Sequence, residues 1–312
     1  MPSFRTLLLS GGEPTLRSDV PQLIETFHST NQIRNVSVPT NGLLPHRIAR
    51  CAVEVAQIDP QLRVTFNVSI DGPAHIHDPI RGVPDAFASA MQTVETLRDV
   101  ADKYDNFRVL LNTVICADNY GQLVSFAEHM GSTGLLDGHF FEIIRGDPFR
   151  ADVKAVPSDA LREIYKSLVP IQEHYLVREA RRCRRGLLGL GRQVADIGTL
   201  INRYRHQWAA FSLNRRWDFP CTAGESITVI DYDGRMRVCE LRQAAVDLAD
   251  YDYDFSEAWS STIMRSEAAT AKTHVCDCTH TCFLGASMRQ HFFARFVQAP
   301  WLYVLYKTGR LW

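Results

Sequence analysis

The segment LRVTFNVSIDG, residues 62–72, limits the possible folds more than any other part of the sequence. Apolar side chains occupy every second position from Leu62 to Ile70, and polar side chains occupy the positions between them. This pattern predicts a β-strand with one buried face and one polar face. A flat parallel sheet covered by helices on both sides would need apolar residues on both faces. A barrel whose inner surface holds a polar ligand explains the polar face better.

Residues 4–145 alternate between strand-like and helix-like segments. Repeated strand–helix units of this kind predict a parallel sheet with right-handed crossovers. We therefore predict an α/β fold, namely an incomplete parallel barrel. The expected strands are residues 4–10, 35–42, 62–71, 107–115 and 138–145, and the expected helices are residues 18–29, 46–58, 85–103 and 119–131.

Composition and charge narrow the range of functions. The 312 residues are 46% hydrophobic and 22% charged, which is typical of a soluble globular protein. The formal net charge of -1 gives no overall attraction to nucleic acid or to an anionic membrane. The sequence has no apolar run long enough to span a bilayer, and its first residues lack the features of a signal peptide. We expect a cytoplasmic protein that has no transmembrane segment and does not bind nucleic acid.

The turn GGEP, residues 11–14, directly follows the first expected strand. Ligands of parallel α/β sheets and barrels bind beyond the carboxyl ends of the strands, so this turn lies where a ligand is expected. Gly11 and Gly12 would let the backbone approach that ligand closely, and Pro14 would stiffen the exit from the turn. A strained turn before a helix would also use glycine and proline, so GGEP alone does not identify a site.

Two further patterns accompany GGEP. Residues 69–82, SIDGPAHIHDPIRG, contain Ser-x-Asp-Gly followed after four residues by His-Asp-x-x-Arg-Gly, and Cys221 begins a Cys-x12-Gly-x4-Cys pattern. Together with the later segment CDCTHTC, these motifs resemble the radical S-adenosylmethionine (radical SAM) superfamily, in the branch that carries a C-terminal SPASM or twitch auxiliary-cluster domain. The resemblance covers residues 4–285. It implies a partial parallel (β/α)6-type barrel followed by a small cysteine-rich α+β domain.

The resemblance also implies a binding site for S-adenosylmethionine at the carboxyl edge of the sheet. It assigns the amino group of the methionine part to the GGEP turn and the ribose to polar residues at the end of the strand at 62–71. It places a further contact on the next strand, and Arg145 would meet the SAM carboxylate or a substrate. The cofactor-binding residues selected in this way are Gly11, Gly12, Glu13, Pro14, Ser69, Asp71, Asn112 and Arg145.

The dipeptide His77-Asp78 could be interpreted as a general base. We prefer a structural role, in which Asp78 and Arg81 bond the loop that follows the strand at 62–71. The preference rests on the resemblance, because the power of this superfamily comes from a radical rather than from acid–base groups.

Eight cysteines are present, and five of them fall in the last third of the chain. Without a secretion signal, such a cluster indicates a metal site sooner than disulfides. Thiolates suit both zinc and iron–sulfur clusters, so the count alone does not separate the two. The candidate ligands are Cys221, Cys239, Cys276, Cys278 and Cys282.

The segment ITVIDYDGRMRV, residues 227–238, predicts a hairpin that would bring Cys221 and Cys239 together. The resemblance implies one auxiliary [4Fe–4S] cluster, with Cys282 as the third ligand and Cys276 or Cys278 as the fourth. A structural zinc site is the alternative, although such sites usually pair their cysteines at closer spacing.

Members of the superfamily bind a catalytic [4Fe–4S] cluster through Cys-x3-Cys-x2-Cys, on the loop after the first barrel strand. Only ten residues precede GGEP here, and none of them is a cysteine. We therefore expect that the sequence is a fragment, or starts at an internal methionine, and that the first strand–helix unit is missing. No catalytic residue is identifiable, and the chain as written should not cleave SAM reductively. The alternative is a natural variant that keeps only a binding role.

The chain divides into four expected parts, each with its own pattern. The partial barrel covers residues 1–150, a helical and arginine-rich connection covers 151–216, the SPASM/twitch-like domain covers 217–290, and an aromatic tail covers 291–312. We expect the tail to pack against the barrel or the cluster domain. A helix that docks on a membrane or a partner is the alternative, but Pro300 is expected to interrupt any long amphipathic stretch.

The resemblance implies a radical SAM enzyme that generates a 5′-deoxyadenosyl radical and abstracts a hydrogen atom. The substrate would be a peptide or a small biosynthetic intermediate, and an electron donor such as flavodoxin or ferredoxin would be needed. Two alternatives remain. One is a non-catalytic protein that binds SAM or a metal, and the other is an α/β-barrel protein with a structural zinc site.

Overall fold

The structure is a computed structural model of the chain. It describes residues 4–182, 187–273 and 278–311, apart from the side chains of residues 187–190 and 192. The predicted metal ligand Cys276 lies outside these described residues, so the structure does not locate it.

The described chain separates into two compact units. The first unit runs up to Glu142 and also includes Pro170–Glu179, while the second comprises Ile143–Val169 and the chain from Ala180 onward. Each unit is described by itself below.

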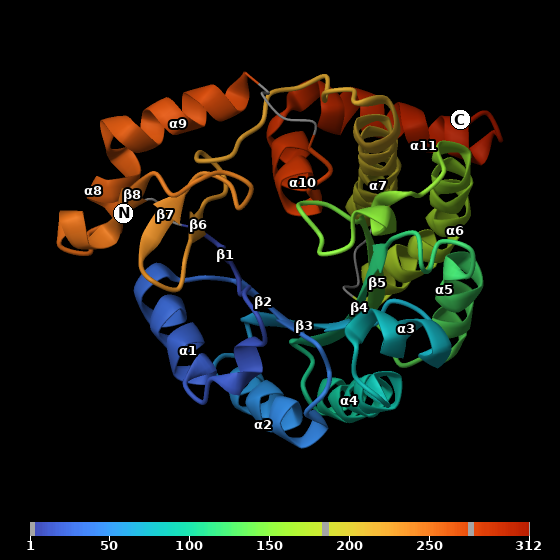
Figure 1. Cartoon of the computed structure of the whole chain (residues 1–312), viewed down its shortest axis with the longest axis horizontal. Coiled ribbons are helices and arrows are strands. Elements are labelled where there is room, and N and C mark those ends of the chain that lie inside the picture. The colour runs from blue at the N-terminus through green and yellow to red at the C-terminus, as the bar shows by residue number, and fades with distance from the viewer. Residues whose placement is uncertain (1–3, 183–186, 274–277, 312) are drawn as a thin grey trace. The chain divides into compact units, whose positions relative to one another are not determined.

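Within the described residues, the first unit contains one sheet of five parallel strands. The strands are hydrogen-bonded in chain order, and Figure 1 shows them as an arc. This curled half-barrel confirms the prediction of an incomplete parallel α/β barrel. The strands are β1 (Thr6–Leu8), β2 (Asn35–Thr40), β3 (Arg63–Ser69), β4 (Phe107–Ile115) and β5 (Gly138–Ile143).

The helices of the first unit follow the strands in turn, and α1, α2 and α4 lie on the convex side of the arc in Figure 1. Their apolar faces form one core with the outward side chains of the strands, including the fully buried Ile48, Phe66 and Leu97. The bounds are η1 (Pro14–Leu16), α1 (Val20–Asn31), α2 (Pro45–Ala56), α3 (Ala74–Arg81), α4 (Ala86–Lys103) and α5 (Leu123–Ser132).

The alternating pattern of β3 is confirmed by burial. Val64, Phe66 and Val68 are completely buried. Asn67 and Ser69, at alternate positions of the same strand, are only half-buried. The polar face of the strand is therefore the inner, concave face of the half-barrel, as the sequence predicted.

The segment after β3, which the sequence analysis treats as a loop, is the short helix α3. Pro73 precedes its first turn, and Gly82 ends it in the left-handed region with φ of +64°. Asp78 accepts a hydrogen bond from the backbone N–H of Phe87 (2.7 Å), which ties α3 to the start of α4.

The outer edge of β5 is covered by part of helix α6 (Ser158–Arg182). Gln172 donates a hydrogen bond from its side chain to the backbone carbonyl of His139 in β5. At the other end of the strands, Glu179 accepts from Arg108 of β4 (3.1 Å). The side chain of Gln172 thus satisfies the backbone carbonyl of His139 at the edge of the sheet.

The second unit contains short strands and longer helices. β6 and β7 pair in antiparallel fashion, with Val229 opposite Arg237, so the predicted hairpin is confirmed. Among the described residues, no helix has both the length and the apolar character that crossing a membrane requires. The bounds are η2 (Ala151–Lys154), α7 (Leu187–Leu213), β6 (Val229–Ile230), β7 (Arg235–Arg237), β8 (Val246–Asp247), η3 (Leu248–Tyr251), α8 (Phe255–Ser260), α9 (Thr262–Lys272), α10 (Thr281–Gln290), η4 (Ala294–Gln298) and α11 (Ala299–Lys307).

The prediction that Pro300 interrupts the tail is wrong. The chain is helical from 292 to 307, because a π-helical segment, η4, leads directly into α11 and Pro300 occupies an early position of that helix. Proline lacks only an N–H that the first turn of a helix does not need, and a π-turn accommodates the change of pitch. The tail packs on α7, where a Cβ added to Gly198 would lie 1.8 Å from the carbonyl oxygen of Ala299.

Candidate functional site

The GGEP turn begins just beyond β1, at the carboxyl edge of the half-barrel. Gly11 has φ of +110°, a conformation that favours glycine, and Gly12 has no such restriction. Both residues are exposed, and within the described chain no atom outside the turn lies within 4 Å of a Cβ added at either position. Backbone conformation therefore explains Gly11, but neither conformation nor packing explains Gly12.

The carboxylate of Glu13 closes the turn. One oxygen, Oε1, accepts from the backbone N–H (3.2 Å) and the hydroxyl (2.5 Å) of Thr15. The other, Oε2, accepts from the hydroxyl of Thr40 (3.1 Å) and the backbone N–H of Asn41 (2.6 Å), both at the end of β2. The predicted site residue Glu13 thus holds the turn in place and joins the ends of two strands.

Helix α2 holds the same turn from the other side. Arg47 donates to the backbone carbonyls of Thr15 (2.6 Å) and Leu16. Sequence reasoning did not select Arg47, Thr40 or Asn41. Thr40 and Asn41 belong to the segment PTNG, residues 39–42, which lies at the end of the second strand and could have indicated them. An arginine on a helix face gives no such signal.

Ser69 and Asn112, both predicted to contact the cofactor, are neighbours at this edge. The register of the sheet pairs Ser69 at the end of β3 with Asn112 of β4, and both side chains are half-buried. Farther from the edge, Asn67 donates to the hydroxyl of Ser37 (2.6 Å). The concave face therefore carries uncharged hydrogen-bonding groups at these four positions.

Asp71 is 3% exposed and lies beneath the turn after β3. Its carboxylate pairs with Arg81 (2.9 Å) and accepts from the backbone N–H of Val114 (3.3 Å), while its own N–H donates to Nδ1 of His77 (3.0 Å). Burial raises the pKa of Asp71, but the interactions with His77, Arg81 and Val114 outweigh it and hold the pKa below its ordinary value. The observed contacts give Asp71 the task of tying β3, α3 and β4 together, and its contact with the cofactor stays a prediction.

Arg145 belongs to the second unit and donates to Glu240 there (2.9 Å and 3.3 Å). The same carboxylate contacts Nε2 of His280 (2.6 Å). The hydrogen bond from His280 and the added charge of Arg145 lower the pKa of Glu240 to about 2, against the effect of burial. The predicted contact of Arg145 with SAM or a substrate stays a prediction, and the observed partner of its guanidinium is Glu240.

The described cysteines of the last third share one apolar cluster with Trp217 and Phe219. Two of them are buried in this cluster and two are half-buried against it, and all are free thiols. These cysteines are Cys221, Cys239, Cys278 and Cys282.

Hydrogen bonds bring the cysteine-bearing segments together. The Glu240–His280 pair joins the residue after Cys239 to the segment of Cys278, and the N–H of Thr222 donates to Ser287 of α10 (3.0 Å).

Backbone N–H groups also point at two of the sulfur atoms. Leu241 N–H donates to Cys239 Sγ (3.5 Å), and His280 N–H donates to Cys278 Sγ (3.3 Å). In each case the donor lies two residues after the cysteine. Such donors favour a thiolate and tune the iron–sulfur clusters that thiolates hold.

Four of the five candidate metal ligands lie within the described residues. Among the residues that the structure describes, no three His, Cys, Asp or Glu side chains form a group that could hold a metal ion. With Cys276 outside the described residues, the full ligand set stays a prediction.

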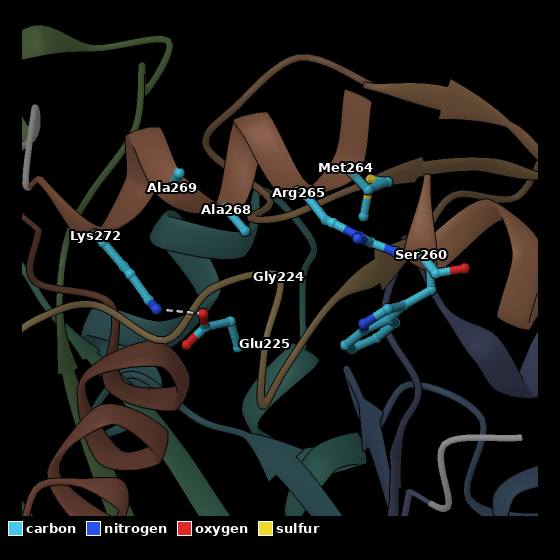
Figure 2. A pocket seen from close by; sticks show the side chains of 9 residues that line it. Gly224, Glu225, Ser260, Met264, Arg265, Ala268, Ala269 and Lys272 are labelled. Carbon is cyan, nitrogen blue, oxygen red and sulfur yellow. Dashed lines mark ion pairs between the residues drawn. The ribbon is translucent and has the colours of Figure 1, made fainter. Parts of the chain in front are cut away.

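A cavity of about 380 Å³ lies elsewhere in the second unit, between α9 and the turn at Gly224. Figure 2 shows Lys272 of α9 reaching toward Glu225, with which it forms an ion pair. The predicted cofactor and metal residues do not line this cavity. We therefore do not assign either group to it.

Sequence comparison finds similar proteins over part of the chain, and no protein-family model matches it. The chain is 28% identical over 130 residues to the AdoMet-dependent heme synthase of Oleidesulfovibrio alaskensis, covering 40% of this chain and 30% of that protein. It is 34% identical over 123 residues to the GTP 3′,8-cyclase of Yersinia pestis, covering 38% of this chain and 34% of that protein. The chain thus spans about a third of the length of these curated relatives.

The fold is similar to the solved structure of anSMEcpe with bound AdoMet and a peptide. The TM-score is 0.53 at 14% sequence identity, over 94% of this chain and 74% of that chain. These relatives and this structural neighbour are radical SAM proteins. The α/β half-barrel is therefore similar in fold to radical SAM proteins, as the resemblance implied, while the SPASM assignment stays a prediction.

Proposed function

We propose that the first unit binds S-adenosylmethionine at the carboxyl edge of its sheet and that the chain is part of a longer radical SAM enzyme. The Oleidesulfovibrio relative is named an AdoMet-dependent enzyme, and the solved neighbour contains AdoMet. Both comparisons support AdoMet as the ligand, and the polar edge formed by β1 to β4 is where we place it.

The observation that carries this proposal is the open surface at Gly12. The turn around this residue is held firmly by Glu13, yet no part of the described chain fills the space where a side chain would project. A rigid turn with bare backbone at its tip offers N–H and carbonyl groups to a ligand without a side chain in the way. The methionine part of the cofactor fits this place.

The residues present at the edge fit the cofactor in their chemistry. The main chain of Gly11 and Gly12 would hold the methionine part, and the hydroxyl of Ser69 with the amide of Asn112 would hold the ribose. Asp71 would act indirectly, by fixing the turn that follows Ser69. Once an electron from a catalytic cluster has cleaved it, bound SAM would supply a radical that abstracts a hydrogen atom, and the residues at this edge would orient the cofactor.

We propose a peptide or a small biosynthetic intermediate as the substrate. The concave face offers uncharged hydrogen-bonding side chains at Ser37, Thr65 and Asn67, which suit amide or hydroxyl groups of a substrate. The solved neighbour contains a peptide. An electron donor such as flavodoxin or ferredoxin completes this proposal.

For the second unit we propose one auxiliary [4Fe–4S] cluster within a domain spanning residues 217–290. Cys221, Cys239 and Cys282 would provide three ligands, and Cys276 or Cys278 the fourth. The shared apolar cluster and the N–H groups aimed at Cys239 and Cys278 support this assignment. A low-polarity surrounding with N–H donors is the setting in which thiolates hold such clusters.

AdoMet binding by isothermal titration calorimetry tests the proposed cofactor site. Gly12→Val should weaken binding at least about tenfold, because the side chain would occupy the surface that the methionine part needs. Gly191→Val is the matched control, since Gly191 also has open space around it but lies on α7 of the second unit. Equal affinity in both variants would contradict the proposal.

Metal content tests the second unit. After anaerobic reconstitution, about four irons and four sulfides per chain are expected, and Cys239→Ala should lose them. Cys51→Ala is the control, because this buried cysteine lies on α2 of the first unit. A content of one zinc and no sulfide per chain would contradict the cluster and indicate a structural zinc site instead.

A further inference from the structure

The tail helix exposes its large apolar side chains. We call these residues the tail stripe, and they follow one another at short helical spacing along η4 and α11. They are Phe292, Phe293, Phe296, Val297, Trp301 and Val304, with exposed fractions of 72%, 52%, 55%, 44%, 60% and 48%.

The buried face of the same helix carries smaller residues. Ala294 and Ala299 are fully buried and Leu302 is 2% exposed. The close approach of Ala299 to Gly198 shows that α7 and the tail pack backbone against backbone. An ordinary surface helix buries its bulky apolar side chains, so this helix is arranged in the opposite way.

Charge is also segregated in this region. Asp277 is the last acidic residue of the sequence, and the following residues include four Lys or Arg and no carboxylate side chain. Arg295 lies over the ring of Phe296 (5.0 Å) and is exposed, as are Lys307 and Arg310. The whole chain has a net charge of -1, so this basic region is a local feature.

We propose that the tail stripe docks on a membrane surface that contains anionic lipid headgroups, with the helix lying in the plane of the interface. Aromatic side chains settle at the level of the headgroups, and nearby Lys and Arg attract anionic lipids. The continuous helix from 292 to 307 provides both on one element.

The same observations argue against a second copy of the chain as the occupant. A two-fold symmetric contact between two tail stripes would bring Arg295 and Lys307 of one chain close to the same cations of the other. No side chain of residues 278–312 is acidic, so the two stripes would place no acidic side chain of their own opposite these cations. Anionic lipid headgroups complement them.

The test is flotation of the full chain with vesicles of phosphatidylcholine and with vesicles of phosphatidylcholine and phosphatidylglycerol in equal amounts. The chain should float only with the anionic vesicles. The triple variant Phe293→Ser, Phe296→Ser, Trp301→Ser should bind them at least about tenfold more weakly, because it loses most of the aromatic area. The double variant Arg295→Glu, Arg310→Glu should lose about tenfold as well, without change to the aromatic residues.

Phe149→Ser is the matched control, because Phe149 is fully exposed but lies outside the tail. It should bind the anionic vesicles as the unaltered chain does, and circular dichroism should show the same helix content in all variants. Flotation that is unchanged in the triple variant would overturn the proposal. So would a lack of flotation combined with a concentration-dependent dimer that the triple variant abolishes, since a second copy would then cover the stripe.

Discussion

The GGEP turn and the cysteine cluster both join distant segments, but by different means. At the turn, strong hydrogen bonds that the Glu13 carboxylate accepts connect the ends of β1 and β2. Around the cysteines, long N–H contacts reach Cys239 and Cys278, and the segments meet through apolar packing and the Glu240–His280 pair. Hydrogen bonds to one carboxylate thus hold the first region, whereas the second combines apolar packing with a charged pair.

The two regions also differ in how closely their glycines are packed. Gly12 has open space around it, whereas a Cβ at Gly224 in the second unit would lie 2.7 Å from Val238 and 2.9 Å from Ala268. Packing therefore accounts for Gly224 but not for Gly12. Other glycines of the described chain are equally open, so it is the place of Gly12 at the end of a strand, together with its open surroundings, that indicates a ligand.

The largest effect is expected for Glu13→Ala. The substitution leaves Thr15, Thr40 and the N–H of Asn41 without their acceptor, and Thr15 and Thr40 are buried. We expect a loss of about 4 kcal/mol in the free energy of unfolding of the first unit, from several charge-assisted hydrogen bonds. Urea unfolding followed by far-UV circular dichroism measures it.

Glu25→Ala is the control for this variant, because Glu25 is exposed on α1 of the same unit. Tryptophan occurs only from residue 208 onward, so its fluorescence follows the second unit and should change little with Glu13→Ala. A loss no larger than that of Glu25→Ala would show that these bonds do not hold the turn.

A smaller effect is expected for Gly42→Ala, at the end of the PTNG segment. Gly42 has φ of +77°, and a Cβ there would lie 2.8 Å from Cα of Ala90. We expect about 2 kcal/mol of destabilisation in urea from overpacking and backbone strain. Gly12→Ala should be neutral within about 0.5 kcal/mol, because no atom opposes its Cβ. If Gly42→Ala and Gly12→Ala lost similar stability, the packing around Gly42 would not explain the effect.

Burial of His139 gives an effect of about 1 kcal/mol that depends on pH. Burial lowers the pKa of His139 from 6.5 to about 3, and its Nε2 bonds the hydroxyl of Thr113 (2.8 Å). Below pH 6.5 the unfolded chain takes up a proton that the folded chain refuses, so stability falls as the pH falls toward 3. Between pH 7 and pH 5.5 the first unit should lose about 1 kcal/mol from this residue.

The pH effect should differ between the two regions. The lowered pKa of Glu240 stabilises the second unit above its ordinary value of 4.5, and this contribution is lost only as the pH falls from 4.5 toward 2. His139→Gln should reduce the loss measured by circular dichroism between pH 7 and pH 5.5, and His46→Gln, at an exposed position of α2, should not. If His139→Gln loses as much stability between pH 7 and pH 5.5 as the unaltered chain does, groups other than His139 would cause the pH dependence.

The sequence predicted the half-barrel well because its information is local. The alternation along β3 determines which face is buried, and β4 has the predicted bounds of 107–115. Helix α3 was missed because it is short and contains Pro79, so its apolar repeat is too brief to recognise. The tail was misjudged because a π-turn, which has no clear sequence signal, allows Pro300 within a continuous helix.

The candidate site was only partly predictable, because its side chains are fixed by tertiary partners. The place of GGEP at a strand end indicated a possible site, and the family resemblance then selected its residues and Ser69. The sequence did not show that Glu13 and Asp71 bond the protein itself, since their partners Asn41 and Arg81 lie 28 and 10 residues away. A carboxylate at a strand end has the same sequence signature whether it faces a ligand or an N–H group.

The smallest effect on stability is expected for Cys282→Ala in the metal-free chain. Cys282 is half-buried at the margin of its apolar cluster, so removing the sulfur should change the free energy of unfolding by less than about 0.5 kcal/mol. Tryptophan fluorescence during urea unfolding measures it. After reconstitution the same variant should bind less iron, because a proposed ligand is gone. If Cys282→Ala instead destabilised the metal-free chain as strongly as Gly42→Ala, the thiol itself would hold this region, and the contrast with the turn would fail.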